Sequence, residues 1–191
     1  MKNIKKYTIF AGVNGAGKST LFQGCMESDL GVRLNTDEMI HEAKLDWKDP
    51  NVQMRVGKVM LDKQKECIEK GITFNQETTL SGRTILKDIQ KAKERGFEIH
   101  LRYVGVENLE IAKERVAARV LRGGHGVDES TIERRYNKTL ENLIAILPIC
   151  DTIHIYDNSG AKIRLIAWQI NGEWYRTDER CLWFDKLNII P

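Results

Sequence analysis

The chain has 191 residues and a mass of 22.0 kDa, the size of one domain that buries about two thirds of its unfolded surface. Lys and Arg number 30 against 27 Asp and Glu, a near balance that does not favour a dedicated nucleic-acid binder. The apolar run at 7–11 is too short for a membrane span or a signal-peptide core. We therefore expect a cytoplasmic protein without a membrane or nucleic-acid partner.

Apolar runs and helical stretches alternate along the chain. Strands are expected at 7–11, 31–35, 72–76, 98–106 and 151–157. Helices are expected at 18–26, 37–45, 51–69 (ended by Gly71), 83–95, after Asn108, and at 128–147. This alternation predicts an α/β fold, with a parallel sheet flanked by helices on both faces.

The pattern changes after Gly160. Apolar stretches at 163–170 and 173–177 flank Asn171-Gly172, the strongest short signal for a β-hairpin. The tail also holds three tryptophans, Trp168, Trp174 and Trp183. Because a tryptophan buries a large area, packing of these rings on the domain is favoured over stacking on a nucleobase. We expect a C-terminal β-hairpin to close the fold.

The stretch GVNGAGKST has the form G-x-x-x-x-G-K-[ST] and lies between an expected strand and an expected helix. Its glycines let backbone N–H groups turn inward around phosphate oxygens. Lys18 is expected to reach the β- and γ-phosphates, and the Ser19 hydroxyl to ligate Mg²⁺. The residues expected to bind ATP or GTP are Gly12, Asn14, Gly15, Ala16, Gly17, Lys18, Ser19 and Thr20.

The signatures of other P-loop proteins are incomplete in this sequence. The guanine-specific N-K-x-D is broken at 137–140, which reads NKTL, and the start of an ABC signature breaks off at Arg83. A D-x-x-G at 157–160 follows the last core strand, too late to sense a γ-phosphate. Phosphate transfer to a bound acceptor is therefore favoured over GTPase or transporter activity.

Two acids follow expected strands at the edge of the sheet where chemistry gathers, Asp37 after the second strand and Glu77 after the third. Phosphoryl transfer to a hydroxyl needs a carboxylate that accepts the alcohol's proton, and oriented ligands for Mg²⁺ and acceptor. The alternative roles are a helix N-cap for Asp37 and a simple polar loop residue for Glu77.

Arginines flank a glycine break on both sides, at Arg115, Arg119, Arg122, Arg134 and Arg135. The first three are spaced by four and three, so they share one helical face. A solvated basic face would explain the pattern, but a flexible Gly123-Gly124 between arginines is typical of a lid that brings guanidinium groups onto a phosphoryl group. His125 lies in the same break and receives no role.

Together these stretches resemble the zeta-toxin-like P-loop kinases. The similarity covers residues 6–158 and rests on GVNGAGKST, NTDEM, ETTLSGRT and RVAARVLRGGHGVDESTIERRY. It implies a P-loop NTPase fold, with one kinase domain over 1–191 whose hairpin and tail occupy 161–191. It also implies Mg²⁺-dependent transfer of the γ-phosphate of ATP or GTP to the 3′-hydroxyl of the N-acetylglucosamine in UDP-N-acetylglucosamine, which starves cell-wall synthesis.

By that resemblance Lys18 binds phosphate, Asp37 is the base and Glu77 helps to hold substrate. Arg119 and Arg135 would stabilise the moving phosphoryl group, and an antitoxin protein is an implied partner. The chain lacks the long C-terminal extension of the larger toxins. Directly after GGHGV it has Asp128, where similar sequences often carry proline. A different acceptor, or a nucleotide-dependent binding switch without transfer, therefore stays open as an alternative.

Overall fold

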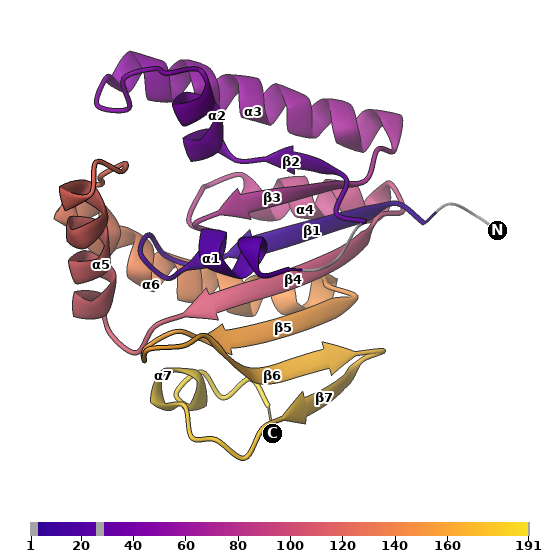
Figure 1. Ribbon diagram of the computed structural model, residues 1–191. Coiled ribbons are helices and arrows are strands. Elements are labelled where there is room, and N and C mark those ends of the chain that lie inside the picture. The colour runs from indigo at the N-terminus through magenta and orange to yellow at the C-terminus, as the bar shows by residue number, and fades with distance from the viewer. Residues whose placement is uncertain (1–3, 26–28, 191) are drawn as a thin grey trace.

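The computed structural model describes residues 4–25 and 29–190, which contain a seven-stranded sheet in the order β2-β3-β1-β4-β5-β6-β7 (Figure 1). The strands are β1 (Lys6–Ala11), β2 (Val32–Leu34), β3 (Phe74–Thr78), β4 (Glu98–Gly105), β5 (Thr152–Asp157), β6 (Arg164–Ile170) and β7 (Glu173–Arg176). The first five strands pair in parallel, and β6 and β7 extend one edge as an antiparallel hairpin. The predicted α/β fold and C-terminal hairpin are confirmed.

Helices connect the parallel strands. They are α1 (Lys18–Gln23), α2 (Thr36–Glu42), α3 (Pro50–Lys70), α4 (Ile85–Glu94), α5 (Leu109–Leu121) and α6 (Glu129–Ile146), with a 3-10 turn at Leu147–Ile149. The short helix α7 (Leu182–Asp185) follows the hairpin. Gly71 ends α3 in the left-handed conformation (φ 67°), as predicted. The predicted end of the first helix, Met26, lies outside the described residues.

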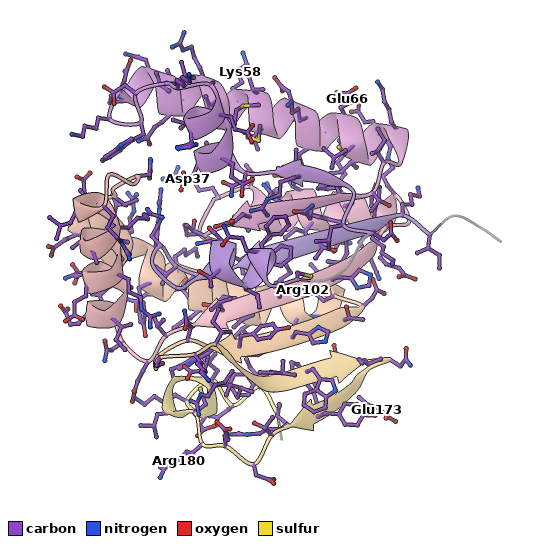
Figure 2. All side chains as sticks on the ribbon, in the orientation of Figure 1. Asp37, Lys58, Glu66, Arg102, Glu173 and Arg180 are labelled. Carbon is purple, nitrogen blue, oxygen red and sulfur yellow. The ribbon has the colours of Figure 1, made fainter. Side chains whose placement is uncertain are left out.

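The main core lies on the face of the sheet covered by α4 and α6, whereas α1 lies on the opposite face (Figure 1). Ile99, Leu101 and Tyr103 alternate along β4 and are all buried in this core. Outward-facing positions of α3 carry charge instead, as Lys58 and Glu66 show (Figure 2). No helix of the described chain combines the length and apolar character needed to cross a bilayer.

The tail packs on the domain, as its tryptophans predicted. Trp183 is only 5% exposed and belongs to the main core, against which Trp174 also packs. Trp168 stacks on Tyr175 across the hairpin, with ring centroids 5.6 Å apart. Packing on the core therefore accounts for Trp183 and Trp174, whereas Trp168 packs within the hairpin itself.

Strand β3 starts and ends two residues later than predicted. The backbone N–H of Ile72 bonds the carbonyl of Cys67 (2.9 Å), so this residue still belongs to the turn that ends α3. The shift places Glu77 inside the strand rather than in the following loop. The backbone of Glu77 is consequently fixed by strand pairing with β1.

Candidate active site

The phosphate loop has a backbone that only glycine adopts without strain. Gly12, Gly15 and Gly17 have φ values of 144°, 82° and 102°. A Cβ on Gly12 would lie 2.2 Å from the carbonyl oxygen of Val104, and one on Gly15 would lie 2.4 Å from that of Ala112. The loop is thus pressed against β4 and α5, which fixes its shape before any ligand arrives.

Lys18 begins α1 and is 8% exposed. Its Nζ donates to the carbonyl oxygen of Val13 (3.2 Å), so the side chain folds back over the phosphate loop. Burial lowers the pKa of this ammonium, and the nearby carboxylates of Glu77 and Asp37 oppose that effect. Because an ammonium carries three donors, this geometry lets Lys18 bind phosphate oxygens beside its bond to the loop.

Glu77 is held on both oxygens. Its Oε1 accepts from the Ser19 hydroxyl (2.8 Å), while Oε2 accepts from the Asn35 amide (2.9 Å) and Arg33 Nη2 (2.7 Å). The Arg33 guanidinium lies over the ring of Phe22, 3.6 Å from its centroid. The sequence reading missed Arg33 and Asn35, which flank the end of β2 and fix Glu77 beside the phosphate loop.

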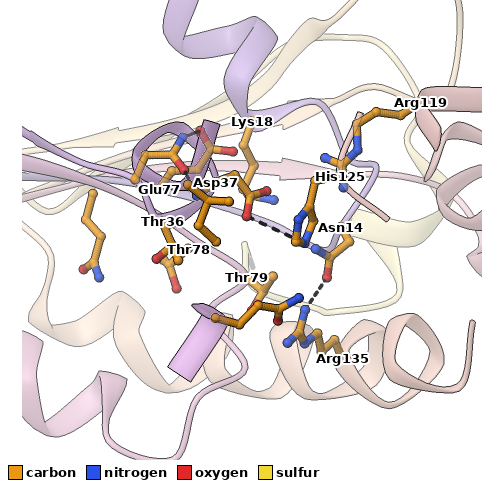
Figure 3. Close-up of a pocket in the computed structure, with 14 residues that line it drawn as sticks. Asn14, Lys18, Thr36, Asp37, Glu77, Thr78, Thr79, Arg119, His125 and Arg135 are labelled. Carbon is orange, nitrogen blue, oxygen red and sulfur yellow. Dashed lines mark hydrogen bonds and ion pairs between the residues drawn. The ribbon is translucent and has the colours of Figure 1, made fainter. Parts of the chain in front are cut away.

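Asp37 does not cap α2, so that alternative reading was wrong. Asn35 is the N-cap, and its side-chain oxygen accepts from the backbone N–H of Asp37 (3.0 Å) and of Glu38 (3.4 Å). The Asp37 carboxylate is 47% exposed and faces the space between α2 and α5 (Figure 2). Its Oδ1 lies 3.8 Å from Nε2 of His125 (Figure 3).

The segment that the sequence predicts to be a lid, residues 115–135 and called the lid below, contributes cations from two helices. Arg119, from α5, has buried Nε and Nη2 atoms with no hydrogen-bond partner among the described residues. Arg135, from α6, donates from Nη1 to the Asn14 side chain of the phosphate loop (2.8 Å; Figure 3). Burial lowers the pKa of Arg135, and the neighbouring Arg134 adds to the effect. Both arginines that the resemblance singled out therefore face the phosphate loop.

His125 is a site residue that the sequence reading left without a role. Its ring packs on Trp47 with centroids 4.8 Å apart, and its buried Nδ1 has no partner within 4–25 and 29–190. Burial lowers the pKa of this imidazole against the opposing effect of Asp37. Its place between Gly123-Gly124 and Gly126 was the available signal, because glycines let a loop approach other backbone closely.

Two cavities meet at the phosphate loop. One of about 390 Å³ runs along α5 and the β5–β6 loop, where it is lined by Arg115, Arg122, Asn158 and Gly160. The other, of about 290 Å³, is lined by Asp37, Gln76, Thr78, His125 and Arg135 (Figure 3). Lys18, Glu77 and Arg119 line both cavities. Because the two cavities share Lys18, ligands bound in them would meet at this residue.

Comparison with known proteins places the chain in a family. Residues 2–167 match the zeta toxin family. A Haemophilus influenzae protein, described as uncharacterized, is 32% identical over 132 residues, which make up 69% of this chain and 92% of that protein.

Solved structures share the fold at low sequence identity. A chain of the AvrRxo1-ORF1:AvrRxo1-ORF2 complex with sulphate ions has a TM-score of 0.64 and 14% identity over 96% of this chain; a structure of that complex with ATP has 0.61 and 15%. This chain spans 63% of those chains, less than two thirds of their length. A chain of the PezAT toxin-antitoxin system of Streptococcus pneumoniae has a TM-score of 0.54 and 19% identity, over 83% of this chain and 69% of that one. Because the family match contains the phosphate loop, both acids and the lid, this protein belongs to the zeta toxin family.

Proposed function

We propose that this protein is a kinase that transfers the γ-phosphate of ATP or GTP to a hydroxyl of a small metabolite, the sugar of UDP-N-acetylglucosamine. The observation that carries the proposal is the meeting of two cavities at Lys18, Glu77 and Arg119. A donor nucleotide fits the cavity beside the β5–β6 loop, and an acceptor fits the one beside Asp37. Residues shared by both cavities would then surround the phosphoryl group in transit.

In the transfer step, the acceptor oxygen forms a bond to the γ-phosphorus and the bond from that phosphorus to the β-phosphate oxygen breaks. Asp37 accepts the proton of the acceptor hydroxyl, because its carboxylate is exposed to the acceptor cavity and free of a capping role. Lys18, Arg119 and Arg135 stabilise the charge on the phosphoryl oxygens. Gly12, Asn14, Gly15, Ala16, Gly17, Ser19 and Thr20 complete the nucleotide site.

The oxygens of Ser19 and Glu77 suit a magnesium ion. They lie 2.8 Å apart beside Lys18, and Mg²⁺ prefers hydroxyl, carboxylate and phosphate oxygens as ligands. In this proposal Ser19 ligates the ion and Glu77 helps to hold it. Bound there, the ion would neutralise phosphate charge. Arg33 and Asn35 keep Glu77 oriented toward that position.

The dimensions of the acceptor side support an extended substrate. The cavity of about 290 Å³ adjoins one of about 570 Å³ lined by Trp47 and Leu45, and both contain Asp37 and His125 in their walls. Small-molecule sites commonly measure about 300 to 1,000 Å³. A nucleotide sugar would fill both spaces, whereas a free sugar would fill only the smaller one.

A protein partner that blocks these cavities belongs to the same proposal. The PezAT neighbour is a toxin-antitoxin system, and the AvrRxo1 neighbour was solved as a two-protein complex. An antitoxin that covers the lid would keep the kinase inactive. Co-expression with a candidate antitoxin, followed by purification of the pair and an assay of its transfer activity, would test this element separately.

Labelled ATP and a panel of nucleotide sugars test the function. Phosphorylation of UDP-N-acetylglucosamine, and not of free N-acetylglucosamine, supports it. Binding of ATP without transfer to any acceptor would instead support the alternative of a nucleotide-dependent switch.

Asp37→Asn tests the base. Asn35 remains the N-cap, so the free energy of unfolding should stay near the wild-type value while kcat falls by about a hundredfold or more. Asp46→Asn, a change of an exposed aspartate in the α2–α3 connection, is the matched control. A variant that keeps wild-type kcat would place the base elsewhere.

A further inference from the structure

A buried carboxylate at the end of β5 joins the tail to the nucleotide side of the site. Asp157 is 1% exposed. Its Oδ1 accepts from Nε1 of Trp183 (2.9 Å) and from the Ser159 hydroxyl, and its Oδ2 accepts from Nη2 of Arg164 (2.7 Å). Arg164 begins β6 and Trp183 lies in α7, so both belong to the C-terminal hairpin and tail. One side chain therefore connects the hairpin, α7 and the β5–β6 loop.

The β5–β6 loop forms one wall of the cavity proposed for the donor nucleotide. Asn158 donates from its side chain to the carbonyl of Ala16 in the phosphate loop (2.8 Å), and from its backbone to that of Gly105 (2.9 Å). The carbonyl of Gly160 accepts from Nη2 of Arg115 (3.2 Å). The loop thus sits between the phosphate loop and α5, and its position sets the width of the cavity.

Ser159 extends the connection to a second loop. Its hydroxyl donates to Asp157 and accepts from the backbone N–H of Glu107 (2.8 Å), which precedes α5. A shift of the Asp157 carboxylate would therefore displace both the β5–β6 loop and the segment that precedes α5.

The tail itself cannot move freely. A Cβ on Gly105 would lie 2.2 Å from the Trp183 ring, so the indole is pressed flat against β4. Burial raises the pKa of the Asp157 carboxyl, but hydrogen bonds from Arg164, Ser159 and Trp183 outweigh that effect and hold the pKa below its ordinary value. Each of these donors therefore stabilises an ionised, fixed carboxylate.

We infer that Trp183 and Asp157 are positioning residues for the donor nucleotide, and that the tail is a working part of the kinase. Trp183 lies beyond residue 167, where the family match ends. Its indole N–H fixes Asp157, and Asp157 fixes the loop that walls the nucleotide cavity. Neither residue lines that cavity, so both act on nucleotide affinity through the loop. The inference rests on the proposed placement of the donor in this cavity.

Trp183→Phe tests the inference, because it keeps an aromatic ring and removes only the N–H. Binding of a fluorescent ATP analogue should weaken about tenfold, the effect of losing a hydrogen bond to a charged group. The kcat at saturating ATP should change less than about twofold, since the reacting groups are untouched. Trp174→Phe, an equivalent change in the same tail without a bond to Asp157, should bind as the wild type does.

The melting temperature without nucleotide is measured for both variants. A merely structural role would lower it for Trp183→Phe and leave the dissociation constant unchanged, which would overturn the inference. If Trp183→Phe does not fold, Ser159→Ala breaks the connection at a partly exposed residue and should weaken binding about threefold. Wild-type affinity in Ser159→Ala would equally overturn it. A wild-type protein that binds no ATP would contradict the proposed function itself, before either variant is compared.

Discussion

The phosphate loop and the lid both line the cavities proposed for phosphate transfer, yet they are built in opposite ways. The phosphate loop is made locally: Lys18 bonds the carbonyl of Val13, five residues away, and glycines at positive φ set its path. The lid is made from distant parts: Arg135 bonds Asn14, 121 residues away. The lid also has buried side-chain nitrogens without partners, on Arg119 and His125, within the described chain.

This difference indicates what each region contributes. A buried donor without a partner costs about 1 to 3 kcal/mol, so the lid carries a cost that a bound phosphate would remove. The phosphate loop instead holds its shape through close backbone packing at Gly12 and Gly15. We therefore expect the phosphate loop to fix the position of the bound phosphates, and the lid to stabilise the phosphoryl group during its transfer.

Lys18→Ala should have the largest effect. Removal of a preorganised positive charge from the phosphates should lower kcat by about a thousandfold while the fold persists. Lys138→Ala, a change of an exposed lysine on α6, is the control. Transfer by the purified variants is measured at saturating ATP and acceptor. If Lys18→Ala keeps more than about a tenth of the activity, the phosphate loop does not work as described.

A pair of glycine substitutions compares the stability of the two regions directly. Gly12→Ala should lower the free energy of unfolding by about 3 kcal/mol, because φ is 144° and its Cβ would lie 2.2 Å from a backbone oxygen. Gly123→Ala, with φ 83° and no neighbouring atom within 4 Å, should cost only about 1 kcal/mol. Urea denaturation measures both. Equal losses would show that the loop is no more constrained than the lid.

Arg119→Ala tests the lid. Nε and Nη2 of Arg119, which have no partner among the described residues, should act mainly in the transition state, so kcat should fall about a hundredfold while ATP affinity changes much less. Arg119→Lys should recover only part of the loss, since an ammonium lacks the planar fork of a guanidinium. Arg134→Ala, a change of the exposed arginine next to Arg135, is the control. Poor ATP binding with normal single-turnover rates would show that Arg119 only attracts anions.

The pH dependence of His125 should be the smallest effect. Burial lowers its pKa, so below about pH 6.5 the unfolded chain takes up a proton that the folded one refuses. Stability is therefore retained above pH 6.5 and declines as the pH falls toward the lowered value. His125→Asn should lose less stability than the wild type between pH 7 and pH 5. If the free energies of unfolding of the wild type and of His125→Asn changed equally with pH, folding would not lower the pKa of this imidazole.

The order of strands and helices, the phosphate loop and the hairpin could be predicted from the sequence. These features depend on contacts between near neighbours: periodic burial, glycine conformation at Gly12 and Gly71, and the Asn171-Gly172 turn. The strand order was not readable, because parallel pairing joins segments separated by whole helices. The start of β3 was misplaced for a related reason, since Ile72 still belongs to the turn that ends α3.

The way in which the site residues are held depends on contacts between distant parts of the chain. Asn35 takes the capping role that was considered for Asp37, and Arg33 anchors Glu77 from the neighbouring strand. His125 reaches Asp37 because the lid folds back over α2, and Trp183 reaches the nucleotide side through Asp157. Such contacts join residues far apart in the chain, and burial then fixes which donor meets which acceptor. A linear pattern carries no signal for that choice, because it depends on how whole elements pack.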